Sequence, residues 1–150
     1  ISIISEVNQF VAFWAEKKWT PFRSQWAIYD EDTGLVGFVD LLAENEQKEF
    51  CLCDWTRSSR MGIENGAEYI LESGVRDAFS TCPLLQMSDS PFNRKTLQLN
   101  ILRTMLKKQY HLQVDQMYLV VFHASNKNFH EVKVPFLEVE DLYRSYCRHK

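Results

Sequence analysis

Apolar and polar residues alternate along the chain with two different periods, which separate predicted helices from predicted strands. One apolar stripe at helical spacing predicts a helix over residues 2–18, and another predicts a helix over residues 96–110. A third helix is expected over residues 138–148, with basic residues in its last turn. The first stripe contains Ile4, Val7, Val11 and Trp14, and the second contains Leu97, Ile101, Leu102, Met105 and Leu106.

Short apolar runs between polar turns predict five strands. These strands are expected over residues 22–29, 35–42, 50–56, 116–123 and 129–134, with turns at 30–34, 44–49 and 124–128. The segment over residues 57–92 has the weakest pattern. It predicts a helix over residues 64–79, which Gly66 and Gly74 disfavour, and then a loop over residues 82–91.

The resulting order of elements is α-β-β-β-(α)-α-β-β-α, which predicts an α/β (α+β) domain with a mixed central β-sheet flanked by helices. The 150 residues are enough for one domain with a core of its own, and no linker or repeat divides them. The sequence does not begin with Met, so we expect residues 1–150 to be one domain of a larger protein.

The second predicted hairpin brings two aspartates together. If the hairpin is symmetric about Gln47, opposed residue numbers add up to 94, and Asp40 faces Asp54. Opposed side chains on antiparallel strands share one face, with Cβ atoms about 4.5–5.5 Å apart. Two carboxylates at that distance repel each other unless a cation lies between them. Thr56 is two residues further on and shares the face of Asp54.

The first predicted hairpin adds a polar residue to this pair. If its centre lies between Asp32 and Thr33, opposed residue numbers add up to 65, and Gln25 faces Asp40. A bulge at Gly34 would shift this pairing by one residue. Gln25, the two aspartates and Thr56 would then form a row across three strands. Strand-end aspartates that only cap turns or face water are the alternative interpretation.

The four cysteines indicate reduced, buried thiols. Cys51 and Cys53 alternate along one strand and, with Trp55, face the side opposite the aspartates. Together with Cys82 and Cys147 they match no spacing expected for an iron–sulfur cluster. With the absence of a signal-peptide pattern, this predicts an intracellular location.

The charge and hydropathy of the chain limit its partners. A net charge of −3 does not imply strong sequence-independent binding to nucleic acid, but it allows a local basic patch. The apolar runs are far shorter than the roughly 20 residues that cross a bilayer, so no membrane partner is expected. Basic residues that could contact phosphate are Arg57 and Arg60 after the third strand, and Arg94, Lys95, Arg103, Lys107 and Lys108 around the second helix. Solvated surface charge is the alternative for all of them.

Four segments in order resemble the PD-(D/E)XK nuclease superfamily, in its RecB-type or lambda-exonuclease-like branch, which includes copies in large viruses and mobile elements. They are Gln25 before "WAIYDED", "GFVD" ending at Asp40, "DWTRS" from Asp54 and "QLNIL" from Gln98. The strand "MYLVVFH" over residues 117–123 also fits. The resemblance implies a restriction-endonuclease-like core, a nuclear or cytoplasmic protein, and nucleic acid as partner, with DNA favoured over RNA.

The resemblance also implies roles for single residues. Asp40 and Asp54 would hold Mg²⁺ or Mn²⁺, and Gln98 would line the site. Three residues depart from the pattern, because Gln25 replaces an acidic residue, Thr56 replaces the lysine of (D/E)xK, and Leu102 replaces a tyrosine.

These departures favour a nuclease-like domain that binds nucleic acid with cleavage impaired or lost, and with no resident metal in the extreme case. Lys95, one turn before Gln98, could supply the missing charge if that turn is helical. An active Mg²⁺-dependent nuclease that uses Lys95 is therefore one alternative. A structural or protein-interaction domain that contacts other domains or subunits is the other.

Overall fold

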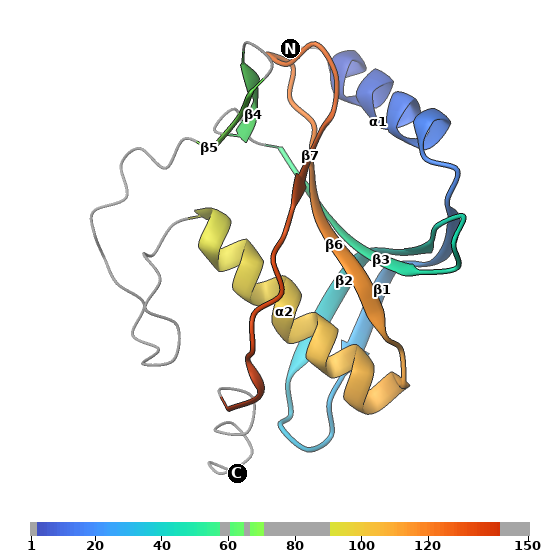
Figure 1. Ribbon diagram of the computed structural model, residues 1–150, viewed down its shortest axis with the longest axis vertical. Coiled ribbons are helices and arrows are strands. Elements are labelled where there is room, and N and C mark those ends of the chain that lie inside the picture. Colours follow the sequence, from blue (N-terminus) through green and yellow to red (C-terminus); the bar gives the residue numbers. More distant parts are fainter. Residues whose placement is uncertain (1–2, 58–60, 65–66, 71–90, 142–150) are drawn as a thin grey trace.

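The computed structural model describes residues 3–57, 61–64, 67–70 and 91–141. Its elements follow the predicted order over most of this length (Figure 1). They are α1 (Ile4–Glu16), β1 (Thr20–Tyr29), β2 (Val36–Glu44), β3 (Phe50–Thr56), β4 (Met61–Glu64), β5 (Ala67–Ile70), α2 (Pro91–Tyr110), β6 (Val114–Val121) and β7 (His130–Lys133). No helix in this part of the chain has both the length and the apolar character needed to cross a bilayer.

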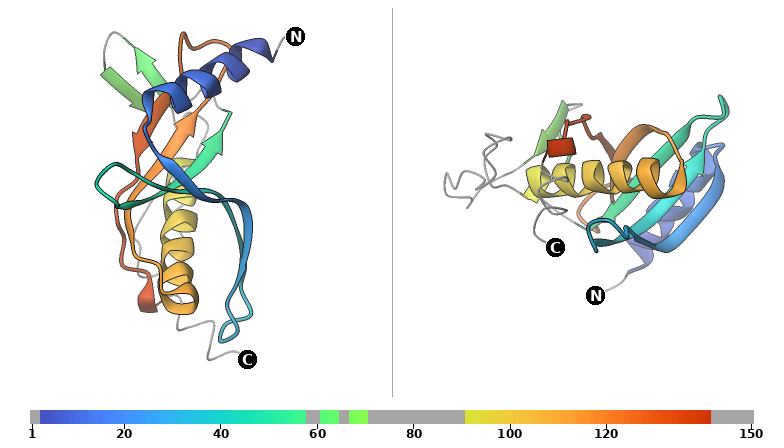
Figure 2. Two further views of the ribbon diagram at one scale, coloured as in Figure 1. Left: turned by 90° about the vertical axis from the view of Figure 1, so that its right-hand side faces the viewer. Right: turned by 90° about the horizontal axis from the view of Figure 1, so that it is seen from below.

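Five strands form a mixed sheet in the order β1-β2-β3-β6-β7, and β4 and β5 form a separate pair. The β3–β6 pair is parallel, and the other pairs of the large sheet are antiparallel. Helix α1 lies on one face of this sheet and α2 on the other, as the two views in Figure 2 show. The predicted class, a mixed sheet flanked by helices, is confirmed.

Helix α2 covers one face of the sheet with aliphatic side chains. Leu99, Leu102, Met105 and Leu106 recur at helical spacing and are buried against the strands. Their partners on the sheet are Ile28, Val39, Leu42, Leu52, Val114, Met117, Leu119 and Val121. Asn100 on the same helix anchors the chain after β7, because its side chain bonds the backbone of Pro135 and Leu137.

Helix α1 covers the other face with aromatic side chains. Phe13 is fully buried and makes edge-to-face contacts with the rings of Trp14, Trp19, Trp55, Phe122 and Phe129. Cys53 is buried in the same cluster, and both Cys51 and Cys53 are free thiols. The prediction that Cys51, Cys53 and Trp55 face away from the aspartates is confirmed.

The predicted apolar stripe of α1 is not its buried face. Ile4, Val7 and Val11 are 65%, 51% and 60% exposed, whereas Phe13 and Gln9 are buried. The Gln9 amide donates to the carbonyl oxygens of His123 and Asn126, and its oxygen accepts from the backbone N–H of His123. A polar residue is buried here because it satisfies the backbone of the turn before β7.

The weakly patterned segment differs from the prediction. Residues 61–64 and 67–70 form paired strands where a helix over 64–79 was predicted, and residues 71–79 lie outside the described residues. The predicted loop over 82–91 falls outside them too, except for Pro91, which begins α2. Only the start of the predicted helix over 138–148 is described. Because α2 begins five residues earlier than predicted, Arg94 and Lys95 are helical.

Candidate active site

The register of the β2–β3 hairpin brings Asp40 and Asp54 together. Leu41 pairs with Cys53 and Leu42 with Leu52, which confirms the predicted register. The paired ladder ends at Leu41, and the next position in the same register is that of the two aspartates. There the backbone N–H of Trp55 donates to Asp40 Oδ2 at 3.0 Å. The Asp40 side chain therefore takes the place of a backbone hydrogen bond at the point where β2 and β3 separate.

A lysine from α2 completes the cluster. Asp54 is 6% exposed, and its Oδ2 lies 2.8 Å from Lys95 Nζ. The Lys95 side chain is 36% exposed, so its ammonium group is at the boundary between the sheet and solvent. The contact exists because α2 starts at Pro91, a residue that fits the first helical position, where no intrahelical N–H bond is needed.

The electrostatics of the pair favour a further cation. The pKa of Asp54 is raised from 3.8 to about 6, because burial and, to a smaller extent, the neighbouring Asp40 carboxyl group raise it more than Lys95 lowers it. The Lys95 ammonium group therefore does not fully offset the cost of burying the Asp54 carboxylate beside Asp40.

The two aspartates fit a metal ion whose other ligands are waters and substrate. In the described parts of the chain, no group of three or more His, Cys, Asp or Glu side chains is arranged to hold a metal ion. Mg²⁺ needs only one or two carboxylates when waters and substrate phosphates supply its other ligands. Asp40 and Asp54 therefore suit Mg²⁺ or Mn²⁺ bound together with a phosphate, and do not form a closed protein cage.

Thr56 and Gln98 belong to the two elements that carry Asp54 and Lys95. Thr56 ends β3, is half-buried and is held by the backbone N–H of Phe122, which donates to its carbonyl oxygen at 2.9 Å. By strand alternation its side chain shares the face of Asp54. Gln98 is exposed on α2, one turn after Lys95.

Gln25 is in the predicted register but does not join the cluster. The pairs Ser24–Leu41 and Trp26–Val39 place Gln25 opposite Asp40. Its φ of 48° is left-handed, and its side chain is exposed. Among the described residues no hydrogen bond joins Gln25 to either aspartate. The predicted row of four side chains is therefore reduced to Asp40, Asp54 and Thr56.

The alternation of β2 changes at the same point. Val39 and Leu42 both pack against the α2 face, although residues three apart on a regular strand face opposite sides. Leu41 and Ala43 pack against the α1 face. The change falls at Asp40, beside the irregular Gln25. Strands β1 and β2 are thus both irregular, at Gln25 and at Asp40, where the pairing of β2 with β3 ends.

The predicted basic residues have different surroundings. Arg57 pairs with Glu6 of α1 at 2.8 Å and so joins α1 to the end of β3. Arg103 donates to the carbonyl oxygen of Leu137 and lies over the Phe136 ring. Lys108 lies 3.5 Å from Glu140, and Arg60 is outside the described residues. Lys95 lies 2.8 Å from Asp54.

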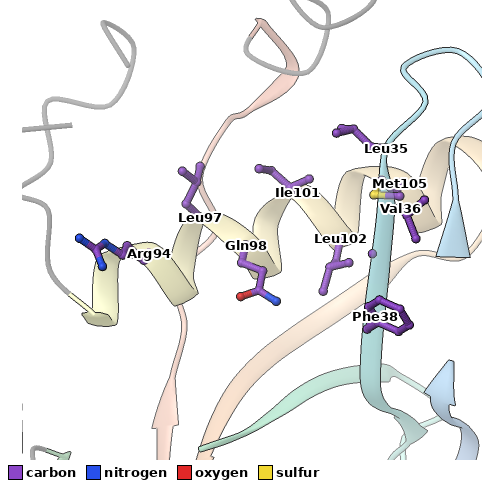
Figure 3. A pocket seen from close by; sticks show the side chains of 10 residues that line it. Leu35, Val36, Phe38, Arg94, Leu97, Gln98, Ile101, Leu102 and Met105 are labelled. Atoms are coloured by element: carbon purple, nitrogen blue, oxygen red, sulfur yellow. The ribbon is translucent and has the colours of Figure 1, made fainter. Parts of the chain in front are cut away.

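A cavity next to this cluster was not predicted from the sequence. It lies between α2 and the start of β2 and has a volume of about 370 Å³ (Figure 3). At Gly37, one of its lining residues, α2 approaches β2 closely, since a Cβ atom there would lie 2.4 Å from Leu102 Cδ2. Its lining residues are Leu35, Val36, Gly37, Phe38, Arg94, Leu97, Gln98, Ile101, Leu102 and Met105.

Comparisons with known proteins do not assign a family. No family model and no curated protein matches the chain. One similar solved structure is described as "Crystal structure of SSO0001", with 13% identity and a TM-score of 0.41. The match covers 97% of this chain and 54% of that one, so this chain spans about half the length of that protein. What the fold and site define is a class: a mixed α+β domain with a paired-carboxylate site at the end of a hairpin.

Proposed function

We propose that this domain is a PD-(D/E)XK-like, metal-dependent nuclease in which Lys95 takes the role of the lysine absent at Thr56. The observation that carries the proposal is the 2.8 Å contact between Lys95 Nζ and Asp54 Oδ2. This contact places an ammonium group from α2 beside the two carboxylates. In the superfamily pattern, a lysine on β3 would supply that group. The function thus rests on a residue triad, Asp40, Asp54 and Lys95.

The three residues have separate tasks in this proposal. Asp40 and Asp54 hold a divalent cation, which when bound activates water and offsets charge on the phosphate. Asp54 has to be ionised to do so, and because its pKa is about 6, we expect metal binding to weaken as the pH falls below that value. Lys95 orients the attacking water and stabilises the negative charge that grows on the phosphate.

The start of α2 suits an anionic substrate. Its first turn contains no acidic residue, and Arg94 and Lys95 lie within its first five residues. Positive side chains there add to the positive partial charge of the helix N-terminus, which favours phosphate. The choice of DNA over RNA, a nuclear or cytoplasmic site of action, and a viral or mobile-element origin are proposals from the resemblance alone.

The Lys95 contact changes the balance between the hypotheses. From sequence, the residues at positions 25, 56 and 102 favoured impaired or lost cleavage. With a lysine on the carboxylate pair, the change at Thr56 no longer argues against catalysis. Gln25 still leaves the site without a third acidic group, so we propose slow turnover. If the wild-type protein is inactive, that result would support a domain that binds nucleic acid without cleaving it.

A cleavage assay tests the proposal. Labelled single- and double-stranded DNA and RNA are incubated with the protein in Mg²⁺, in Mn²⁺ and in chelator. Wild type should cleave in metal only, and Lys95→Ala should lose about 10²–10³-fold in rate, as when one charge-stabilising donor is removed. Lys133→Ala, an exposed lysine on β7, is the matched control. Wild type that cleaves no substrate, or Lys95→Ala that cleaves like wild type, would contradict the proposal.

One observation favours a second candidate, an interaction domain within a larger assembly. The exposed apolar side chains of Ile4, Val7 and Val11 lie on one stripe of α1. If that stripe is an interface, Val7→Asp should weaken association without lowering stability. Sedimentation velocity over a range of concentrations tests the simplest case, self-association, and an unchanged profile would remove it.

A further inference from the structure

We propose that Gln25 positions Asp40 through its backbone. The left-handed residue allows β1 and β2 to exchange faces, and this exchange turns the Asp40 carboxylate toward Asp54 and Lys95. Gln25 is thus a positioning residue, and its side chain does not stand in for the acidic group of the superfamily pattern. The consequence for metal binding rests on the proposed function, whereas the consequence for the Asp40 side chain does not.

The side chains before and after Gln25 point to opposite faces of the sheet. Trp26 packs with the core under α2, and its ring contacts Tyr110. Ser24 pairs with Leu41, which packs against the α1 face, and opposed residues on antiparallel strands share a face. Residues 24 and 26 of a regular strand would face the same side. The exchange of faces on β1 therefore falls at Gln25.

Strand β2 makes the same exchange at Asp40, the residue opposite Gln25. Val39 packs under α2. Leu41, two residues further on, packs under α1, although a regular strand would keep both on one face. The pairs before and after this point keep one register. The two strands therefore change faces together, at a single pair of opposed residues.

The backbone of Gln25 departs from that of a strand. Its φ of 48° lies in the left-handed region, which is sterically unfavourable for a residue with a Cβ atom. Among the residues that the structure describes, the other non-glycine residues with positive φ are Lys48 and His111, and both lie between elements. A left-handed residue turns the chain where an extended one would continue the pleat. Such conformations cluster at functional sites, where the surrounding structure holds them.

The exchange sets the face that Asp40 occupies. If β2 kept the alternation of its first half, Asp40 would face α1 and lie away from Lys95. In the observed strand, Asp40 Oδ2 accepts a hydrogen bond from the backbone N–H of Trp55 at 3.0 Å, beside Asp54. Because the side chain of Gln25 is exposed, we assign the effect on Asp40 to its backbone.

The backbone amide of Trp55 reports the position of Asp40 independently of catalysis. Its chemical shift is compared in ¹H–¹⁵N NMR spectra of wild type, Asp40→Ala and two Gln25 variants. Gln25→Gly accepts a left-handed backbone, so the Trp55 amide should keep its wild-type position. Gln25→Val disfavours that backbone, so the amide should move to its position in Asp40→Ala. Ala27→Val, at an exposed position of β1, is the matched control and should leave it unchanged.

Titration with Mn²⁺ alone measures the consequence for the site. Gln25→Gly should bind Mn²⁺ like wild type, because the backbone of residue 25, and not its side-chain amide, positions Asp40. Gln25→Val should bind about 10–100-fold more weakly, the usual loss when a residue that orients a metal ligand is changed. Free Mn²⁺ is measured by its electron paramagnetic resonance signal.

The outcomes separate the positioning role from the metal site. An unchanged Trp55 amide in folded Gln25→Val, or a shift in Gln25→Gly as large as in Asp40→Ala, would overturn the role. A shift confined to Gln25→Val, in a protein whose wild type binds no Mn²⁺, would support the role and refute the proposed metal site. If Gln25→Val does not fold, Gln25→Thr, also β-branched, takes its place. Loss of folding in both, with Ala27→Thr folded, would overturn the role, because Gln25 would then support the whole sheet.

Discussion

The two faces of the sheet differ in the side chains that fill them and in how completely they are closed. Under α1, Phe13 has no exposed surface and is surrounded by five aromatic rings. Under α2 the core is aliphatic, and at one end it gives way to Asp40, Asp54 and the cavity. We expect the closed aromatic face to contribute stability, and the proposed site lies where the other face opens.

The largest effect should come from the closed face. Phe13→Ala should lower the free energy of unfolding by about 3–5 kcal/mol, since it removes a ring from a fully packed cluster. Val11→Ala, on the exposed stripe of the same helix, should change it by less than about 0.5 kcal/mol. Urea denaturation of both variants measures the difference. Similar losses in the two would mean that α1 packs through its Ile–Val stripe after all.

The next effect concerns the close approach of α2 to β2 beside the cavity. Gly37→Ala should cost about 1–3 kcal/mol of stability, because the new methyl group meets Leu102 Cδ2. Leu102→Ala opens a void on its own, but it makes room for that methyl group. The double variant should therefore be more stable than the sum of the single losses predicts, by more than about 0.5 kcal/mol. Strict additivity would show that the two residues do not touch.

A smaller effect should appear in the pH dependence of stability. The folded pKa of Asp54, about 6, lies above its ordinary value of 3.8. The folded state therefore binds the proton more tightly, and stability falls as pH rises from about 4 to about 6 and stays lower above it. Asp54→Asn should remove this fall and melt higher than wild type at pH 7.5, with the difference closing below pH 4.

Thermal melting in metal-free buffer measures this effect. Lys95 can turn to solvent in Asp54→Asn because its side chain is already partly exposed. Asp141→Asn, at an exposed aspartate, is the control and should follow the wild-type profile. If Asp54→Asn lowers the melting temperature at pH 7.5, the ion pair with Lys95 outweighs the burial of the carboxylate.

The sequence predicted the elements and register that depend on local pattern. The β2–β3 register followed from a symmetric turn between two clear strands, so the pairing of Asp40 with Asp54 could be predicted. The start of α2 could not be predicted from periodicity, because residues 91–95 contain one apolar side chain besides Pro91. Pro91 itself was a usable signal, since proline favours the first turn of a helix.

Other errors have equally specific causes. Apolar residues surround much of α1, so periodicity did not distinguish the Ile–Val stripe from the face with Phe13. The burial of Gln9 depends on a turn more than a hundred residues away. The β4–β5 pair flanks the sequence Asn65-Gly66, a strong hairpin signal that was outweighed by a weak helical pattern. The cavity depends on packing between α2 and β2 and left no sequence signal.

We propose that the catalytic lysine is on α2 and not on β3, and moving a lysine to position 56 on β3 tests this most directly. Metal-dependent cleavage is measured for wild type, Lys95→Ala and Lys95→Ala/Thr56→Lys. Lys95→Ala should be about 10²–10³-fold slower than wild type. The double variant should recover a measurable part of this loss, because position 56 shares the face of Asp54. Full activity in Lys95→Ala, or no recovery in a folded double variant, would contradict the account.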